Sequence, residues 1–215
     1  MKLQLILHIL LSYNLVAAAT MAADWPQFRG VGGQGVSADG NLPVSWSDSK
    51  NLLWKAKLPG HGASSPIAVD DRLFVSSYSG YGLDPQSPGS MDELRLHLTC
   101  FNLTGDQLWD REIQPKLPET ERVRDHGYAA PTPASDGSFV YVFFGKSGLF
   151  KFDMNGQQIW QASVGEKTHG WGCGTSPVLF QDLVIVNASV ESGDLVAIHQ
   201  ATGKEVWRAG GVGAT

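Results

Sequence analysis

Charged residues are scarce in this sequence. They make up 17% of the 215 residues, and the net charge of -5 comes without any run of basic side chains. Proteins that bind duplex DNA or anionic lipid through charge concentrate Lys and Arg in one patch. The composition therefore predicts no nucleic-acid partner and no electrostatic attachment to a membrane.

Cysteine is also rare, since the sequence contains only Cys100 and Cys173. Cys100 falls in an expected strand and Cys173 in a loop of a later repeat, so a disulfide would have to join two repeats. Either that bridge or two separate thiols is compatible with an oxidising compartment.

Long hydrophobic runs are missing after the N-terminus. Residues 3–16 are mostly apolar, follow the positive charge of Lys2 and precede three alanines. The run is shorter than the roughly 20 residues that a spanning helix needs. We expect residues 1–23 to be a signal peptide, cleaved after Ala19 or Ala23, and the protein to be periplasmic or secreted, with no stable membrane span after cleavage. An uncleaved membrane anchor is the alternative.

Glycine and tryptophan are abundant, with 25 and 7 copies, and they occur in a repeated phrase. A turn ending in Gly, two polar residues, an aliphatic residue and Trp recur at 104–109, 155–160 and 202–207, and a fainter copy lies at 51–54. The four Trp residues stand 55, 51 and 47 residues apart. A period of this length indicates a repeat architecture.

Each repeat contains four short apolar stretches. A Ser-Pro or Thr-Pro step opens the first, two strongly apolar runs follow, and the Trp begins the last, as at 54–58, 109–113 and 160–164. Four short antiparallel strands repeating about every 50 residues form the blade of a β-propeller. We therefore expect an all-β protein with an extended arm at 24–50, a partial propeller at 51–215 and blades at about 59–113, 126–164 and 169–211. Residues 78–93 are expected to form a surface loop, and we expect no helix.

The conserved spacing of the phrase gives its residues structural roles. The Trp side chains are expected to lie between neighbouring blades, where an aromatic ring buries a large area. The Gly residues are expected to supply the positive backbone angle of the preceding hairpin. These structural positions are Trp54, Trp109, Trp160, Trp207, Gly105, Gly156 and Gly203.

The phrase resembles the tryptophan-docking repeat of the pyrroloquinoline quinone (PQQ) type β-propellers, and Asp24-Trp25-Pro26 resembles the N-terminal segment of that family. The resemblance implies seven or eight blades, so three units predict an incomplete propeller, either a truncated product or part of a longer chain. Residues 54–58 would then be a strand whose partners this sequence lacks. The family includes quinoprotein dehydrogenases and the propeller scaffold of the outer-membrane β-barrel assembly machinery.

A His-Gly pair precedes the first strand of each repeat, at His61, His126 and His169. The three imidazoles could ring the mouth of the channel and bind a metal or an anionic ligand. Alternatively, they belong to the turn chemistry of the repeat, which we favour because the loops differ in length; we therefore assign no metal site. Trp171 could stack on a flat ligand or pack over the channel mouth.

The resemblance also defines what a dehydrogenase would need: a ring formed by adjacent cysteines, a stacked Trp and a calcium ion beside an Asp. The two cysteines are not adjacent, and no Ser-His-Asp or paired-carboxylate set is evident from spacing, so we assign no catalytic residue. We expect an exported, non-catalytic scaffold without a cofactor that binds a protein partner or small ligand at a propeller face. The alternative is the N-terminal part of a PQQ-dependent alcohol or sugar dehydrogenase, with PQQ and calcium. A detached sensor or ligand-binding domain is a third possibility.

Overall fold

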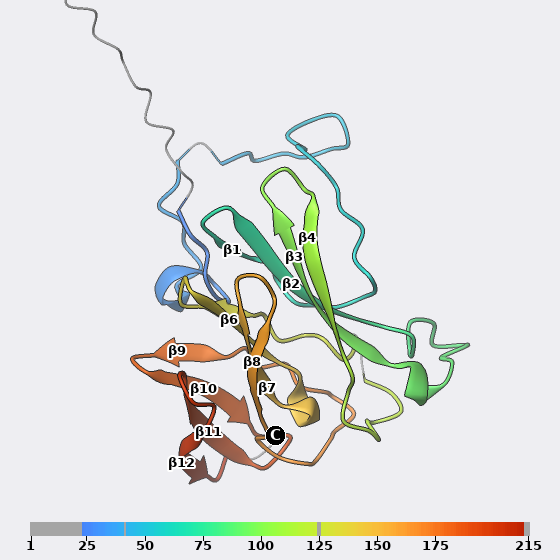
Figure 1. Cartoon of the computed structure of the whole chain (residues 1–215). Helices are drawn as coiled ribbons and strands as arrows, with labels where there is room; N and C mark the ends of the chain where they lie inside the picture. Colours follow the sequence, from blue (N-terminus) through green and yellow to red (C-terminus); the bar gives the residue numbers. More distant parts are fainter. Residues whose placement is uncertain (1–22, 41, 124–125, 213–215) are drawn as a thin grey trace, which may run out of the picture.

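The computed structural model describes residues 23–40, 42–123 and 126–212. They form three four-stranded antiparallel sheets, each made of strands consecutive in the sequence (Figure 1). The predicted all-β architecture of propeller blades is confirmed. The signal peptide prediction lies outside the described residues, apart from Ala23. Blade 1 comprises β1 (Ile67–Val69), β2 (Arg72–Ser79), β3 (Arg95–Asn102) and β4 (Gln107–Ile113); blade 2 comprises β5 (Ala134–Ser135), β6 (Phe139–Phe143), β7 (Leu149–Asp153) and β8 (Gln158–Ala162); blade 3 comprises β9 (Val178–Phe180), β10 (Leu183–Ala188), β11 (Asp194–His199) and β12 (Glu205–Gly210).

The last strand of each blade begins two residues before its Trp rather than at the Trp. The preceding turn is tight, because the Asn102 side chain accepts hydrogen bonds from the backbone N–H groups of Thr104 and Asp106. Pairing between β3 and β4 therefore starts at Gln107, with a register shift between Cys100 and Phe101.

Residues 54–58 do not form the predicted strand. Their alternating pattern is that of a half-buried strand, but a strand also needs a neighbour for its backbone hydrogen bonds. All four strands of every described sheet come from later parts of the chain. The segment is therefore held by side chains instead, chiefly by Trp54.

The predicted surface loop at 78–93 begins later than expected. Tyr78 and Ser79 belong to β2, and the Tyr78 side chain is buried. Helical structure in the described part of the chain is limited to three short 3-10 segments, η1 (Val31–Gly33), η2 (Met91–Glu93) and η3 (Gly145–Ser147). None of the described helices is long and apolar enough to cross a membrane.

The N-terminal arm is fastened across two blades. Trp25 and Ala68 exchange both backbone hydrogen bonds, at 2.8 and 3.0 Å. The carbonyl of Pro26 accepts a hydrogen bond from the N–H of Ser135 at 2.8 Å, and Ser135 lies in β5. The arm thus joins the first strand of blade 1 to the first strand of blade 2.

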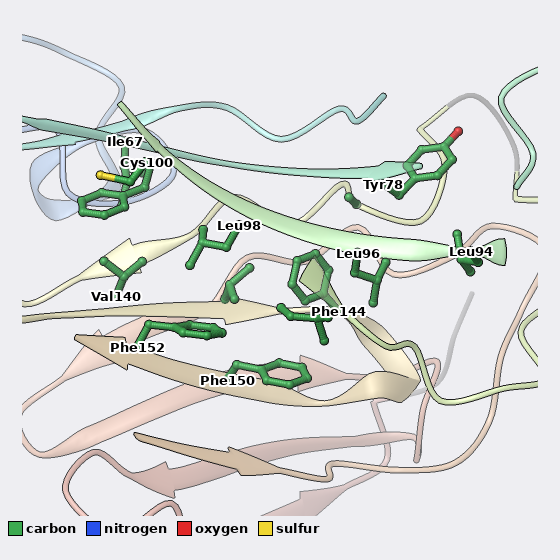
Figure 2. Packing of buried hydrophobic residues seen from close by; sticks show 14 of the residues in the cluster. Ile67, Tyr78, Leu94, Leu96, Leu98, Cys100, Val140, Phe144, Phe150 and Phe152 are labelled. Carbon is green, nitrogen blue, oxygen red and sulfur yellow. The ribbon is translucent and has the colours of Figure 1, made fainter. Parts of the chain in front are cut away.

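The hydrophobic core lies between blades, because side chains alternate across each sheet. In blade 2, Val140, Phe150 and Phe152 face blade 1, while Tyr141 and Phe143 face blade 3. Figure 2 shows the first of these layers, in which Leu96 and Leu98 of β3 point toward Phe150 and Phe152 of β7. Each blade is therefore stabilised mainly by its neighbours.

Three of the repeated Trp residues dock on the next hairpin. The indole N–H groups of Trp54, Trp109 and Trp160 donate to the carbonyls of Leu103, Met154 and Gln200 at 2.9 to 3.0 Å. A Cβ added at the repeated glycines would lie 2.6 to 2.8 Å from those indole rings, so only glycine allows this approach; these positions are Gly105, Gly156 and Gly203. Trp207, on the last described strand, is 37% exposed.

The Ser-Pro and Thr-Pro steps form a second connection between blades. The N–H of Ser65 donates to the hydroxyl of Thr132 at 3.1 Å, and the N–H of Thr132 donates to the hydroxyl of Ser176 at 2.9 Å. Each hydroxyl residue precedes the proline that opens a blade. The residue before the proline therefore links neighbouring blades, in addition to preceding the first strand of its own blade.

Antiparallel order places two kinds of connection at opposite ends of the blades. The connections from the second to the third strand and from one blade to the next lie at one end, which we call the loop end. The tight turns between the remaining strand pairs lie at the other, the hairpin end. In Figure 1 the β3–β4 turn and the chain leaving β4 mark the two ends of blade 1.

Candidate functional site

The loop end carries the cavities found in the described part of the protein. The cavity that we call the Glu191 cavity has a volume of about 560 Å³ and lies in blade 3. Its wall is formed by the connection before β9, which contributes His169, Trp171 and Cys173, by the end of β10, which contributes Asn187, and by the β10–β11 loop, which contributes Glu191. A cavity of this volume is in the range of sites for small organic ligands.

Glu191 is the most unusual residue of this wall. Its side chain is only 2% exposed, and its Oε2 atom has no hydrogen-bond partner among the described residues. Burial raises the pKa of the Glu191 carboxyl to about 7, with backbone and Cys173 hydrogen bonds acting in the opposite direction. A buried carboxyl with an unpaired oxygen lowers the stability of the folded protein. A group of this kind therefore suggests a function.

Two glycines make room for Glu191. A Cβ added at Gly145 would lie 3.0 Å from the Oε1 atom of Glu191. A Cβ added at Gly165 would lie 2.2 Å from the Glu191 carbonyl oxygen and 2.8 Å from its Cβ. The carbonyl of Glu191 also accepts hydrogen bonds from the N–H groups of Glu166 and Lys167, both at 3.1 Å. Backbone from two other loops therefore surrounds this acid, and one of them holds its carbonyl by hydrogen bonds.

A second acid lies on the far side of Glu191. Glu119 and Glu191 both line a narrow cavity of about 30 Å³ between blades 2 and 3, together with Lys146. Burial raises the pKa of Glu119 to about 7, the charge of Lys146 opposes this, and the charge of Glu191 adds a small increase. The Lys146 ammonium donates to the carbonyl of Pro118 at 2.6 Å. Such a volume can hold about one water molecule.

A larger cavity of about 790 Å³ opens beside blade 1 and is lined by three tyrosines. The Tyr78 and Tyr128 rings meet edge to face at 5.3 Å, and Tyr81 lies 6.1 Å from Tyr128. The hydroxyls of Tyr81 and Tyr128 donate to backbone carbonyls of Glu121 and Thr120. These phenols therefore hold the backbone of residues 120 and 121, in the connection between blades 1 and 2.

The three His-Gly residues lie at the loop end but have different surroundings. His61 lies against Tyr78 and exchanges two backbone hydrogen bonds with it. The Nε2 atom of His126 is buried without a partner among the described residues. His169 lines the Glu191 cavity, and its Nδ1 accepts a hydrogen bond from the N–H of Trp171 at 3.2 Å. The described residues contain no group of three or more His, Cys, Asp or Glu side chains placed to hold a metal ion.

Trp171 and the two cysteines also have defined positions. Trp171 lines the Glu191 cavity and is 55% exposed. Cys100 and Cys173 are separate thiols; Cys100 is fully buried in the core between blades 1 and 2, and Cys173 lies beside Glu191. Burial raises the pKa of Cys173, which keeps this thiol protonated at neutral pH.

The structure brings together a Ser, a His and an Asp that the sequence spacing did not reveal. In blade 1 the Ser79 hydroxyl lies 2.8 Å from Nε2 of His97, and Nδ1 of His97 lies 2.9 Å from Asp110. Thr99 donates to the same Asp110 carboxylate at 2.7 Å. The order matches that of a nucleophile, a base and an acid. However, His97 is 4% exposed and none of the three lines any of the three cavities described above, so the set serves to join β2, β3 and β4.

The quinone and calcium centre of the resemblance does not fit these residues. The ring that clamps the quinone requires adjacent cysteines. Cys100 lies in the core between blades 1 and 2, whereas Cys173 lines the Glu191 cavity, so the two cysteines are not adjacent. Glu191 lines the Glu191 cavity and Glu119 lines the cavity of about 30 Å³, and neither forms part of a metal-holding group among the described residues. No step through a quinone can be derived from this geometry.

Comparison with known proteins places the fold in a family. The family model described as outer membrane protein assembly factor BamB matches residues 29–213. The chain therefore belongs to this family of PQQ-like β-propeller repeats. A search of curated proteins gave no match.

Several solved structures resemble this chain over part of their length. Quinohemoprotein alcohol dehydrogenase from Comamonas testosteroni matches with a TM-score of 0.55 at 18% identity. The matched region covers 86% of this chain and 27% of the dehydrogenase chain. BamB from Moraxella catarrhalis has a TM-score of 0.43 at 20% identity and covers 76% of this chain and 41% of its own. A europium-containing methanol dehydrogenase has a TM-score of 0.46 at 20% identity and covers 78% of this chain and 27% of its own. The chain thus spans less than half the length of these proteins.

Proposed function

We propose that the protein is an exported, non-catalytic propeller that acts as a binding or assembly scaffold and uses the loop end as its binding face. The observation that carries this proposal is the Glu191 cavity, with a buried carboxyl oxygen that has no partner among the described residues. Export is supported by the signal-like composition of residues 1–23. The partner is a protein or a small ligand, and no cofactor is required.

Site-specific photo-crosslinking in cells of the source organism tests the binding face. A photoreactive phenylalanine replaces either Trp171 at the loop end or Leu103 at the hairpin end, where the Leu103 side chain is 49% exposed. We expect adducts, detected by intact mass and by gel shift, at Trp171 and not at Leu103. Equal labelling at both positions, or none at Trp171, would contradict the proposal.

The dehydrogenase alternative is tested separately on purified protein. PQQ and calcium are added, and reduction of an electron-accepting dye is followed with a panel of alcohols and aldoses. We expect no reduction above the rate without substrate. Substrate-dependent reduction that requires the quinone would establish the alternative instead. N-terminal sequencing of exported protein tests cleavage after Ala19 or Ala23.

A further inference from the structure

The Glu191 cavity has an asymmetric set of charges. Glu191 is the only carboxylate residue among its lining residues, and neither Lys nor Arg lines it in the described part of the chain. The remaining ionisable groups are the exposed His169 and the protonated thiol of Cys173. An ionised Glu191 therefore gives this cavity a negative potential that basic side chains do not neutralise.

The orphan oxygen of Glu191 also requires a particular kind of atom. An ionised carboxylate accepts hydrogen bonds only, so the unpaired Oε2 can be satisfied by an N–H or O–H donor and gains most from a charged one. A hydrogen bond from Cys173 already acts on this carboxyl. A ligand that donates from a cationic nitrogen would supply both the missing hydrogen bond and the missing charge.

The lining of the same cavity also includes an aromatic side chain. Trp171 contributes a half-exposed indole to the same cavity. An indole face attracts a cation, and it also packs on a flat or apolar group. At about 560 Å³ the cavity has room for several non-hydrogen atoms beyond the charged group.

We propose that the Glu191 cavity binds an organic cation with an amidinium, guanidinium or ammonium group, which donates to the Glu191 carboxylate while its body lies against Trp171. This inference rests on the proposed use of the loop end for binding and names the chemistry of its ligand. Oε2 is covered by protein atoms, so these atoms have to move slightly for the donor to reach it.

The free cation and the arginine side chain of a protein partner share this chemistry. Benzamidinium represents the free ligand, and a blocked pentapeptide with a central arginine represents the protein partner. Benzamide has the same shape as benzamidinium without the charge. Calcium chloride tests whether Glu191 holds a metal ion instead. Each is titrated into the full chain by isothermal calorimetry.

We expect saturable binding of benzamidinium and at least tenfold weaker binding of benzamide. Glu191→Gln should weaken benzamidinium at least tenfold, because glutamine keeps the shape but loses the charge. Trp171→Ala should weaken it about three- to fivefold. Glu166→Gln is the matched control, since Glu166 lies in the neighbouring loop with its side chain 64% exposed and paired with Lys116. It should change the affinity less than twofold.

The pH dependence gives a readout that a loss of structure would not produce. Benzamidinium stays charged, while Glu191, with its pKa of about 7, must ionise to bind it. Affinity should therefore rise about tenfold between pH 6 and pH 8 in the wild type and stay level in Glu191→Gln. The other charged or titratable groups lining the two cavities that Glu191 borders are Glu119, Tyr128, Lys146, Lys167, His169 and Cys173.

Several outcomes would overturn the inference. Equal affinity for benzamidinium and benzamide, an unchanged affinity in a Glu191→Gln protein with native circular dichroism, or Glu191-dependent binding of calcium alone would each do so. Binding of the peptide but not of benzamidinium would assign the site to a protein side chain. If neither cation binds while crosslinking at Trp171 persists, the cation inference fails and the loop-end binding face stands.

Discussion

The last strands of blades 2 and 3 carry the same repeated Trp phrase, but the two Trp side chains have different surroundings. The Trp160 indole of blade 2 is partly buried, donates to the carbonyl of Gln200 and lies over Gly203 of blade 3. The Trp207 indole of blade 3 is 37% exposed, and three apolar residues on the two outer strands of this blade, Val206 on β12 and Val178 and Phe180 on β9, are all more than half exposed. The structure describes no sheet beyond blade 3. The Trp therefore stabilises the interface between two blades rather than its own sheet.

A second difference separates the two ends of the interface between blades 2 and 3. At the hairpin end, the Gln200 carbonyl accepts from both Trp160 and the buried Lys151 ammonium at 2.9 Å. At the loop end, Glu191 keeps an oxygen without a partner among the described residues. The hairpin end is thus built for stability, whereas the loop end carries a cost that binding can repay.

The largest expected effect is at Trp160. Trp160→Ala removes the indole between blades 2 and 3, together with its hydrogen bond, and leaves a cavity. We expect a loss of about 3 to 5 kcal/mol in the free energy of unfolding. Chemical denaturation followed by circular dichroism measures it. An unchanged midpoint would contradict the role of the Trp in joining blades.

The glycine beneath the indole should have the next largest effect. Gly203 and Gly137 both have positive φ angles, of 68° and 89°, but a Cβ at Gly203 would lie 2.8 Å from Trp160, while a Cβ at Gly137 would meet nothing within 4 Å. Gly137→Ala therefore measures backbone strain alone, about 1 kcal/mol. Gly203→Ala should cost roughly 1 to 3 kcal/mol more, by overpacking against the ring. Equal losses in the two variants would show that the close approach is unimportant.

The free energy of unfolding should depend on pH because Glu191 is buried at the loop end. The pKa of Glu191 is raised to about 7 in the folded protein, so between its ordinary value and pH 7 the folded state holds more protons than the unfolded state. The stabilisation that the protonated Glu191 carboxyl gives the folded state is therefore complete below the ordinary pKa of a glutamate. It is lost as the pH rises through about 7. Glu191→Gln cannot ionise, so it should gain up to about 3 kcal/mol relative to wild type between pH 5 and pH 8.

Denaturation of both proteins at the two pH values measures this gain. Glu119 has a raised pKa of the same sign and stays in both proteins, so its effect largely cancels in the difference. Glu166→Gln, which changes an exposed carboxyl, should follow the wild type at both pH values. A difference between wild type and Glu191→Gln that does not change with pH would mean that Glu191 is not buried as an acid.

Much of the fold was predictable because its causes are local. The spacing of the Trp phrases fixed the repeat, and alternation within runs such as Phe139–Phe143 identified strands whose two faces meet different blades. Residues 54–58 show where this reasoning stops. Their alternation is as regular as that of the true strands, but whether a strand forms also depends on a neighbour that the pattern cannot show.

The site was only partly predictable because its parts come from separate loops. The His-Gly pairs and Trp171 lie at the loop end, where His61, His169 and Trp171 line cavities. Glu191 could not be identified, because an acid after an apolar strand is ordinarily a solvated turn residue. Its burial depends on Gly145 and Gly165, which lie in other loops. The Ser79, His97 and Asp110 set was missed for the same reason, although the lone polar His97 between Leu96 and Leu98 was a usable signal.

The smallest expected effect is at Trp207, and it is the counterpart of Trp160. Trp207→Ala removes the same side chain from the same position of the phrase, but at a face with no described sheet packed against it. We expect a change of less than about 0.5 kcal/mol in the isolated chain, as for most surface substitutions. Denaturation under the conditions used for Trp160→Ala provides the comparison. A loss comparable to that of Trp160→Ala would mean that Trp207 is covered in solution, and if that loss grew with protein concentration, the cover would be another molecule.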